Sequence, residues 1–328
     1  MRALPRTVVL LGAQRVNPSL GEAVSALGIS GKIAIVSAGW QERESEDEEL
    51  VQHLDGRAVN LKLHARADDV FRGDPELGAA YRARQQQLHQ RQDFYRVRLE
   101  HALDADHTIR ARRPSPALLE EESEVSNAAI RGLDDRHLAR CLELHRDFDA
   151  KWNVGERPVV ARHRREVAEL VAGTDAIAIA GGHVATLINR LTLFGIADLV
   201  GTRALFAWSG GAMVVTERIV LFHDDPPQGP GASEVLDAGL GLVPGVVALP
   251  APEQRLRYDQ KERVSGMVRR FAPAACLALP ARSYVTWQDG RATAASGVIE
   301  LLADGSNAPL TVERASEIAA AAREGRRA

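Results

Sequence analysis

The chain has few cysteines, few aromatic residues and no long apolar run. Of its 328 residues only Cys141 and Cys276 are cysteines, too far apart for a metal knuckle and too few for a disulfide framework. No stretch approaches the roughly 18 apolar residues that cross a bilayer, and the N-terminal segment lacks a signal-peptide cleavage pattern. We therefore expect no contact with a membrane and a reducing, cytoplasmic location.

The chain also lacks a large excess of charge of either sign. The 41 Lys and Arg residues against 44 Asp and Glu residues give a net charge of -3, so no overall attraction for nucleic acid is expected. No glycine-rich phosphate-binding motif and no His-Glu-x-x-His pattern occurs, which predicts neither a nucleotide cofactor nor a metal. A hydrophobic content of 45% with 26% charged residues is ordinary for a globular protein.

Short apolar segments that end in turns alternate with segments of helical length in two parts of the chain. The expected strands are 7–11, 32–37, 59–63, 175–180 and 203–208. Most are apolar on both faces, the pattern of parallel strands covered by helices. We predict an α/β fold with a mostly parallel sheet sandwiched between helices. Ligands on such sheets bind beyond the carboxyl ends of the strands, where Gly12, Gly39, Gly181 and Ser209 fall.

The middle of the chain is predicted to be helical. Leu, Tyr and Phe recur at helical spacing among Gln and Arg over residues 75–103, and further helices are expected at 117–130, 134–148 and 159–172. We divide the chain into an N-terminal part of the α/β domain (1–70), a helical insertion or cap (71–155), and the remainder of the α/β domain (156–328). The apolar stripe of the insertion must be buried, either on the sheet domain or against a second copy in a homodimer.

The segment Ala207-Trp208-Ser209-Gly210-Gly211 has the form of a nucleophile elbow. In such an elbow the chain reverses sharply between a strand and a helix, and the serine hydroxyl stands exposed above the sheet. Backbone N–H groups at the start of the helix can then stabilise an oxyanion. The other interpretation of the same string is a turn without chemistry.

Four segments together resemble the cyanophycinase and aspartyl dipeptidase (peptidase E) family of serine peptidases. They are GGHVATLINRL at 181–191, FAWSGGAMVV at 206–215, HDDP at 223–226 and GLGLVPGVV at 239–247. The resemblance implies a class I glutamine amidotransferase-like fold in which a serine replaces the usual cysteine. It also implies cleavage of a peptide or isopeptide bond near an acidic residue, and so a small peptide or acidic substrate or ligand.

The resemblance carries over to particular residues. Ser209 matches the nucleophile, and Asp224, fifteen residues later, matches the residue that orients the base in the dipeptidase branch. The paired glycines Gly181 and Gly182 match the family's oxyanion-hole pair, and Gly210 would supply the second N–H.

The histidine departs from the family pattern. Aligning the Pro-Gly pair puts Ala251 where the general base should be, and an alanine cannot accept the serine's proton. His183 and His223 are the candidate replacements, although His223 and Asp224 are consecutive and would point in opposite directions in an extended segment. Two functions therefore remain: a divergent serine peptidase-like hydrolase, or an inactive pseudo-peptidase that binds a ligand or a protein.

Overall fold

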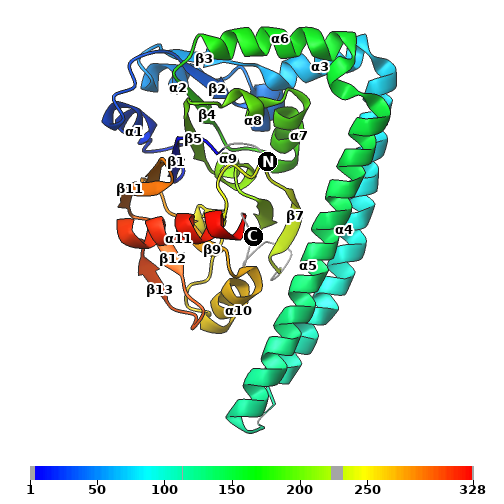
Figure 1. Cartoon of the computed structure of the whole chain (residues 1–328), viewed down its shortest axis with the longest axis vertical. Helices are drawn as coiled ribbons and strands as arrows, with labels where there is room; N and C mark the ends of the chain where they lie inside the picture. Colours follow the sequence, from blue (N-terminus) through cyan, green and yellow to red (C-terminus); the bar gives the residue numbers. More distant parts are fainter. Residues whose placement is uncertain (1–3, 113, 223–231, 327–328) are drawn as a thin grey trace.

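The computed structural model describes residues 4–112, 114–222 and 232–326 of the chain. Its centre is a seven-stranded sheet in the order β11-β10-β1-β5-β4-β2-β3, shown in Figure 1. The parallel strands are β1 (Thr7–Leu11), β2 (Ile33–Val36), β3 (Ala58–Asn60), β4 (Ala176–Ile179) and β5 (Ala204–Trp208). Two antiparallel strands, β10 (Tyr284–Gln288) and β11 (Arg291–Ser296), extend the sheet beyond β1. The predicted mostly parallel sheet is confirmed, with β5 at its middle.

Successive side chains of each strand point to opposite faces of this sheet, and they form one core on each face. In β5, Leu205 and Ala207 join the core beneath α3 (Leu63–Gly73), α6 (Pro158–Ala172), α7 (Val184–Leu193) and α9 (Gly210–Val214). Phe206 and Trp208 of the same strand join the core beneath α1 (Leu20–Ala26) and α2 (Glu48–His53). Both faces are therefore covered, which explains why these strands are apolar throughout.

The C-terminal part adds smaller elements below this sandwich. A four-stranded sheet runs in the order β13-β12-β9-β8, and β6 and β7 form a separate antiparallel pair. Their bounds are β6 (Arg218–Leu221), β7 (Glu234–Ala238), β8 (Val246–Pro250), β9 (Ala275–Leu279), β12 (Ile299–Leu301) and β13 (Asn307–Pro309). The remaining helices are α8 (Ile196–Leu199), α10 (Lys261–Phe271) and α11 (Val312–Gly325), with 3-10 turns η1 (Ala38–Arg43), η2 (Val154–Glu156) and η3 (Pro252–Gln254).

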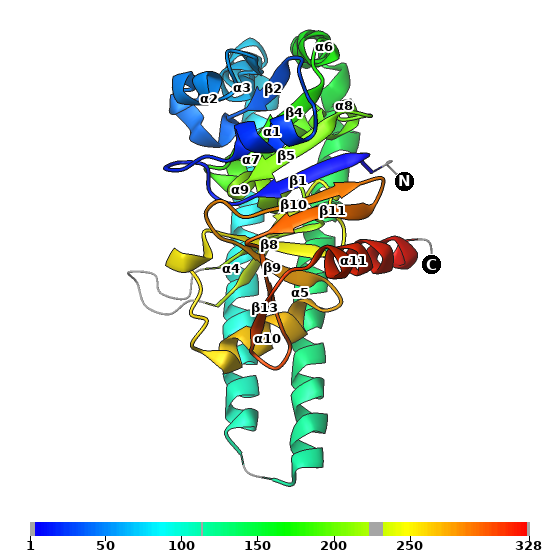
Figure 2. The same ribbon diagram turned by 90° about the vertical axis from the view of Figure 1, so that its left-hand side faces the viewer.

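The helical region is a long antiparallel hairpin of α4 (Pro75–Arg110) and α5 (Pro116–Trp152). It runs along the whole body, and its distal end extends past α10 in both views (Figures 1 and 2). Each helix begins with a proline. Proline fits the first helical position because an N–H group there would have no acceptor within the helix. The sequence predicted two helices over 117–148, but α5 is continuous. Its middle packs against β7 and α10, and this support holds Gly132 in the helix despite that residue's low helix propensity.

A buried polar cluster joins the hairpin to the C-terminal part. Arg270 of α10 donates from Nε to Asp134 Oδ2 of α5 at 2.7 Å and from Nη2 to the Tyr95 hydroxyl of α4 at 2.8 Å. The side chains of Arg270 and Asp134 are 4% and 1% exposed. Because so deeply buried an ion pair must satisfy its hydrogen bonds within the protein, this cluster fixes where the hairpin lies.

Neither cysteine takes part in a disulfide. Cys141 and Cys276 are both buried, and burial raises the pKa of each thiol to about 12. They are therefore protonated at neutral pH and poor nucleophiles. In the described part of the chain, no helix combines the length and the apolar character that a membrane crossing requires.

Candidate functional site

Ser209 lies on a strained turn at the carboxyl end of the central strand. It follows β5 directly, precedes α9, and adopts φ 51 and ψ -129. A positive φ is uncommon for a residue with a side chain and marks a conformation held by its surroundings. The Ser209 side chain is half-buried and forms no capping hydrogen bond with α9. The elbow predicted from the sequence is thus present, with its hydroxyl not engaged by the helix.

Glycines allow the turns after β2, β4 and β5 to touch one another. A Cβ atom on Gly181 would lie 2.5 Å from the Ser209 Cβ, and one on Gly39 would lie 2.5 Å from the Gly181 carbonyl oxygen. Gly182 has φ +112, and a Cβ there would lie 2.3 Å from the Gly39 carbonyl oxygen. These separations are far below ordinary contact, so a side chain at any of the three positions would push the turns apart.

The N–H groups expected to form an oxyanion hole meet at this point. The Gly210 backbone lies against Gly182, since a Cβ on Gly210 would be 3.1 Å from the Gly182 oxygen and 3.5 Å from its nitrogen. Within the ranges that the structure describes, neither the Gly182 N–H nor the Gly210 N–H donates to a protein acceptor. Two donors beside Ser209 are therefore free to bind a negatively charged oxygen.

A cleft of about 880 Å³ opens beside Ser209. Segments that follow four parallel strands line it: Ala13 and Gln14 after β1, Gly39 and Trp40 after β2, Gly181 and Gly182 after β4, and Ser209 after β5. This is the carboxyl edge of the sheet, where ligands of such folds bind. The volume is ordinary for a small-molecule or peptide site.

The rest of the wall combines charged side chains with apolar ones such as Val16, Leu20 and Leu50. Arg15, Arg43, Glu46, Glu49 and His53 line it. Arg43 donates to Glu46 at 2.7 Å and holds the pKa of that carboxyl below its usual value, so both groups are charged at neutral pH. Arg15 is exposed. No carboxylate oxygen of the described residues lies within 4.0 Å of its guanidinium group, so it forms no ion pair with them. The cleft therefore offers a cation to an acidic ligand.

The loop that carries Arg15 is fixed by one side chain. Gln14 donates to the Gly12 carbonyl at 2.9 Å and accepts N–H bonds from Ser19 at 2.7 Å and Leu20 at 2.8 Å. These bonds tie the turn after β1 to the start of α1. The wall of the cleft on that side is thereby held in one conformation.

His183 is engaged elsewhere. It is exposed and caps α7, where its Nδ1 accepts the Thr186 N–H at 3.2 Å and lies 2.9 Å from the Thr186 hydroxyl. With that lone pair occupied, a neutral imidazole carries its proton on Nε2 and has no acceptor left for a serine proton. His183 is not among the residues that line the cleft.

Sequence reasoning missed a histidine that does line the cleft. His53 is half-buried at the end of α2, the helix that follows β2 and η1. No motif surrounds it. The only available signal was its position after a strand whose carboxyl end faces the expected site. It is the histidine of the described residues that shares the cleft with Ser209.

Ala251, at the position where the family pattern expects the base, is not among the residues that line the cleft. Ala251 directly follows β8, adopts φ 51 and ψ 53, and its N–H donates to the Leu279 carbonyl at 3.3 Å. His223 and Asp224 fall outside the described residues. The structure thus brings Ser209, Gly181, Gly182 and Gly210 together, and the assignment of a base and its orienting acid stays a prediction.

Comparison with known proteins gives a distant structural likeness. No protein-family model and no curated protein matches the chain. Among solved structures it is similar to a peptidase from an acI-B1 Actinobacterium, with 14% sequence identity and a TM-score of 0.45. That match covers 94% of this chain and 98% of the other.

Proposed function

We propose that the protein is a serine hydrolase of the peptidase E and cyanophycinase type, acting on a peptide or isopeptide bond next to an acidic residue. The observation that carries this proposal is the backbone of Ser209, at φ 51 and ψ -129 on the carboxyl end of the central strand. Such strain costs stability and is typical of positions whose function needs it. The free N–H groups of Gly182 and Gly210 support the same interpretation.

The chemistry requires a base as well as an oxyanion hole. In the proposed reaction the Ser209 oxygen attacks the carbonyl carbon while its proton passes to His53, and Gly182 and Gly210 donate to the oxygen as it becomes negative. The amine then leaves with that proton, and water hydrolyses the acyl-enzyme. His53 is our candidate base because it lines the same cleft. The imidazole would have to come within about 3 Å of the hydroxyl when substrate binds.

Arg15 is our candidate for substrate selection. It projects from the loop held by Gln14 into the cleft, where its charge suits a carboxylate of the substrate. Arg15→Gln should raise KM for an acidic peptide and leave kcat unchanged, because the side chain binds ground and transition states alike.

A fluorophosphonate probe tests the proposal directly. We expect it to label the native protein, not to label Ser209→Ala, and to label His53→Ala at least about 100-fold more slowly because the general base is gone. His183→Ala is the matched control and should label at the native rate, since that imidazole caps α7. Native labelling as slow as that of Ser209→Ala would refute a hydrolytic role.

The second candidate function is a pseudo-peptidase that binds its ligand without turnover. Two observations favour it: Ala251 stands at the family's histidine position, and the His183 Nδ1 is already bonded to Thr186. Ala251→His separates the two functions. If Ser209 lacks a base, the new histidine should raise labelling, whereas an enzyme that already uses His53 should be unaffected.

A further inference from the structure

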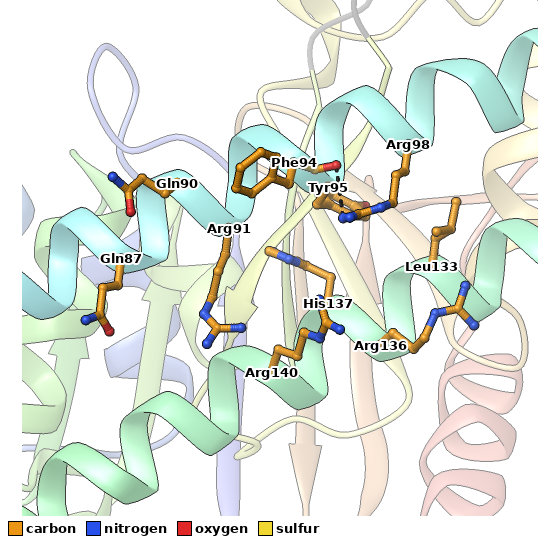
Figure 3. A pocket seen from close by; sticks show the side chains of 10 residues that line it. All are labelled: Gln87, Gln90, Arg91, Phe94, Tyr95, Arg98, Leu133, Arg136, His137 and Arg140. Carbon is orange, nitrogen blue, oxygen red and sulfur yellow. Dashed lines mark hydrogen bonds between the residues drawn. The ribbon is translucent and has the colours of Figure 1, made fainter.

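A second cavity, unrelated to the Ser209 cleft, lies between the two helices of the hairpin. It has a volume of about 510 Å³, and all of its walls come from α4 and α5, as Figure 3 shows. It shares no lining residue with the cleft beside Ser209. Its contents must therefore be inferred independently of any hydrolase activity.

Four arginines line this cavity. Arg91 and Arg98 are seven residues apart on α4, and Arg136 and Arg140 are four apart on α5, so each pair lies on one side of its helix. In Figure 3 the side chain of Arg91 extends from α4 into the space between the two helices. Like charges four residues apart, as in Arg136 and Arg140, destabilise a helix.

Among the described residues, these four arginines have no carboxylate partner in an ion pair. No acidic side chain from the ranges 4–112, 114–222 and 232–326 lines the cavity either. By contrast, Arg96 on the same helix pairs with Glu234 at 2.7 Å. The cavity is thus a concentrated positive site on a chain whose net charge is -3.

The rest of the lining suits a ligand that is more than a bare ion. Phe94 stands at the cavity with 65% of its surface exposed, which is unusual for a large apolar side chain. Tyr95 and His137 stack at 4.2 Å between their ring centroids. The amides of Gln87 and Gln90 add neutral hydrogen-bonding groups at one end.

We propose that this cavity binds a compact polyanion whose charges are carried by linked phosphoryl groups. A guanidinium group presents paired N–H donors that match two oxygens of a phosphate. Four such groups around about 510 Å³ call for several charges within a small volume. Consecutive phosphoryl groups meet that need, whereas successive acidic side chains of a peptide alternate in direction and hold their charges farther apart.

Titration calorimetry with inorganic triphosphate tests the proposal on the full chain. We expect one saturable site whose affinity falls as salt is added, because the contacts are partly exposed to solvent. Arg91→Gln and Arg140→Gln should each weaken binding about tenfold or more through the loss of charge-assisted hydrogen bonds. Arg146→Gln is the matched control: it is exposed on α5, lies outside the cavity and should bind normally.

A second titration, with ATP, distinguishes a free chain of phosphates from the phosphate chain of a nucleotide. Equal affinities would assign binding to the phosphates alone, and tighter binding of ATP that disappears in Phe94→Ala would add stacking of a base. Three results would overturn the proposal. They are the absence of saturable binding at low salt, an equal loss of affinity in Arg146→Gln, and tighter binding of hexaglutamate than of triphosphate. Circular dichroism of each variant keeps a folding defect from being read as lost affinity.

Discussion

Replacing Arg270 by methionine should destabilise the protein strongly, because the arginine closes a buried cluster. It donates to both carboxylate oxygens of Asp134 at 2.7 Å, to the Tyr95 hydroxyl at 2.8 Å and to the Ser233 carbonyl at 2.7 Å. Arg270→Met would leave the Asp134 carboxylate, whose side chain is 1% exposed, with the Tyr95 hydroxyl as its only donor among the residues that the structure describes. Breaking a buried ion pair from one side costs about 3–5 kcal/mol.

Removing both charges should cost less than removing one. In Asp134→Leu combined with Arg270→Met, no unpaired charge remains, and apolar side chains of similar size occupy the space. We expect the double variant to be more stable than Arg270→Met by about 2 kcal/mol. Tyr95 keeps its proton throughout, since burial raises the pKa of its hydroxyl far above neutrality.

Urea unfolding followed by circular dichroism measures these free energies. The adjacent Arg269 is the matched control: it pairs with Glu120, whose side chain is 71% exposed, and Arg269→Met should cost less than about 1 kcal/mol. The reasoning fails if Arg270→Met costs no more than Arg269→Met, or if the two substitutions of the cluster are additive. Either result would mean that the pair of Arg270 and Asp134 contributes little to holding the hairpin in place.

Four further predictions concern other parts of the fold. Gly39→Ala should destabilise the protein by about 1–3 kcal/mol, because its Cβ would lie 2.5 Å from a carbonyl oxygen. Gly266→Ala, in α10 with nothing within 4 Å of the new atom, should stabilise it by up to about 1 kcal/mol, and thermal melting compares the two. Asp74 caps α4 and is paired with Arg157, which lowers the pKa of the carboxyl. The stabilisation by the ionised Asp74 carboxylate is therefore complete above the unfolded-state pKa of about 4. It is lost as the pH falls through the lower folded-state pKa. The difference in unfolding free energy between the native protein and Asp74→Ala should therefore disappear in acid. The buried Arg84 guanidinium lies 4.4 Å from the ring centroid of Tyr81 and 4.2 Å from that of Phe148. Arg84→Gln should therefore lower the free energy of urea unfolding by about 1–2 kcal/mol. An unchanged unfolding midpoint would show that these ring contacts contribute nothing.

The sequence by itself determined the local features of this protein. The parallel strands were predictable because most of them are apolar on both faces, and the elbow at Ser209 because only small residues permit so sharp a turn. The helix beginning at Pro75 was predictable from the proline and the apolar spacing behind it. The predicted boundaries of other elements were wrong where packing overrode local propensity. Examples are α5, which is unbroken, and β3, which ends at Asn60.

Only the tertiary structure decided which side chains meet. His53 reaches the Ser209 cleft although 156 positions separate them, and nothing in its neighbours marks it. Arg270 pairs with Asp134 across 136 positions, and the arginine cavity exists only because α4 and α5 fold back on one another. Periodicity and turn chemistry act over a few residues, whereas the packing of apolar faces sets the partners of charged and catalytic groups across the whole chain.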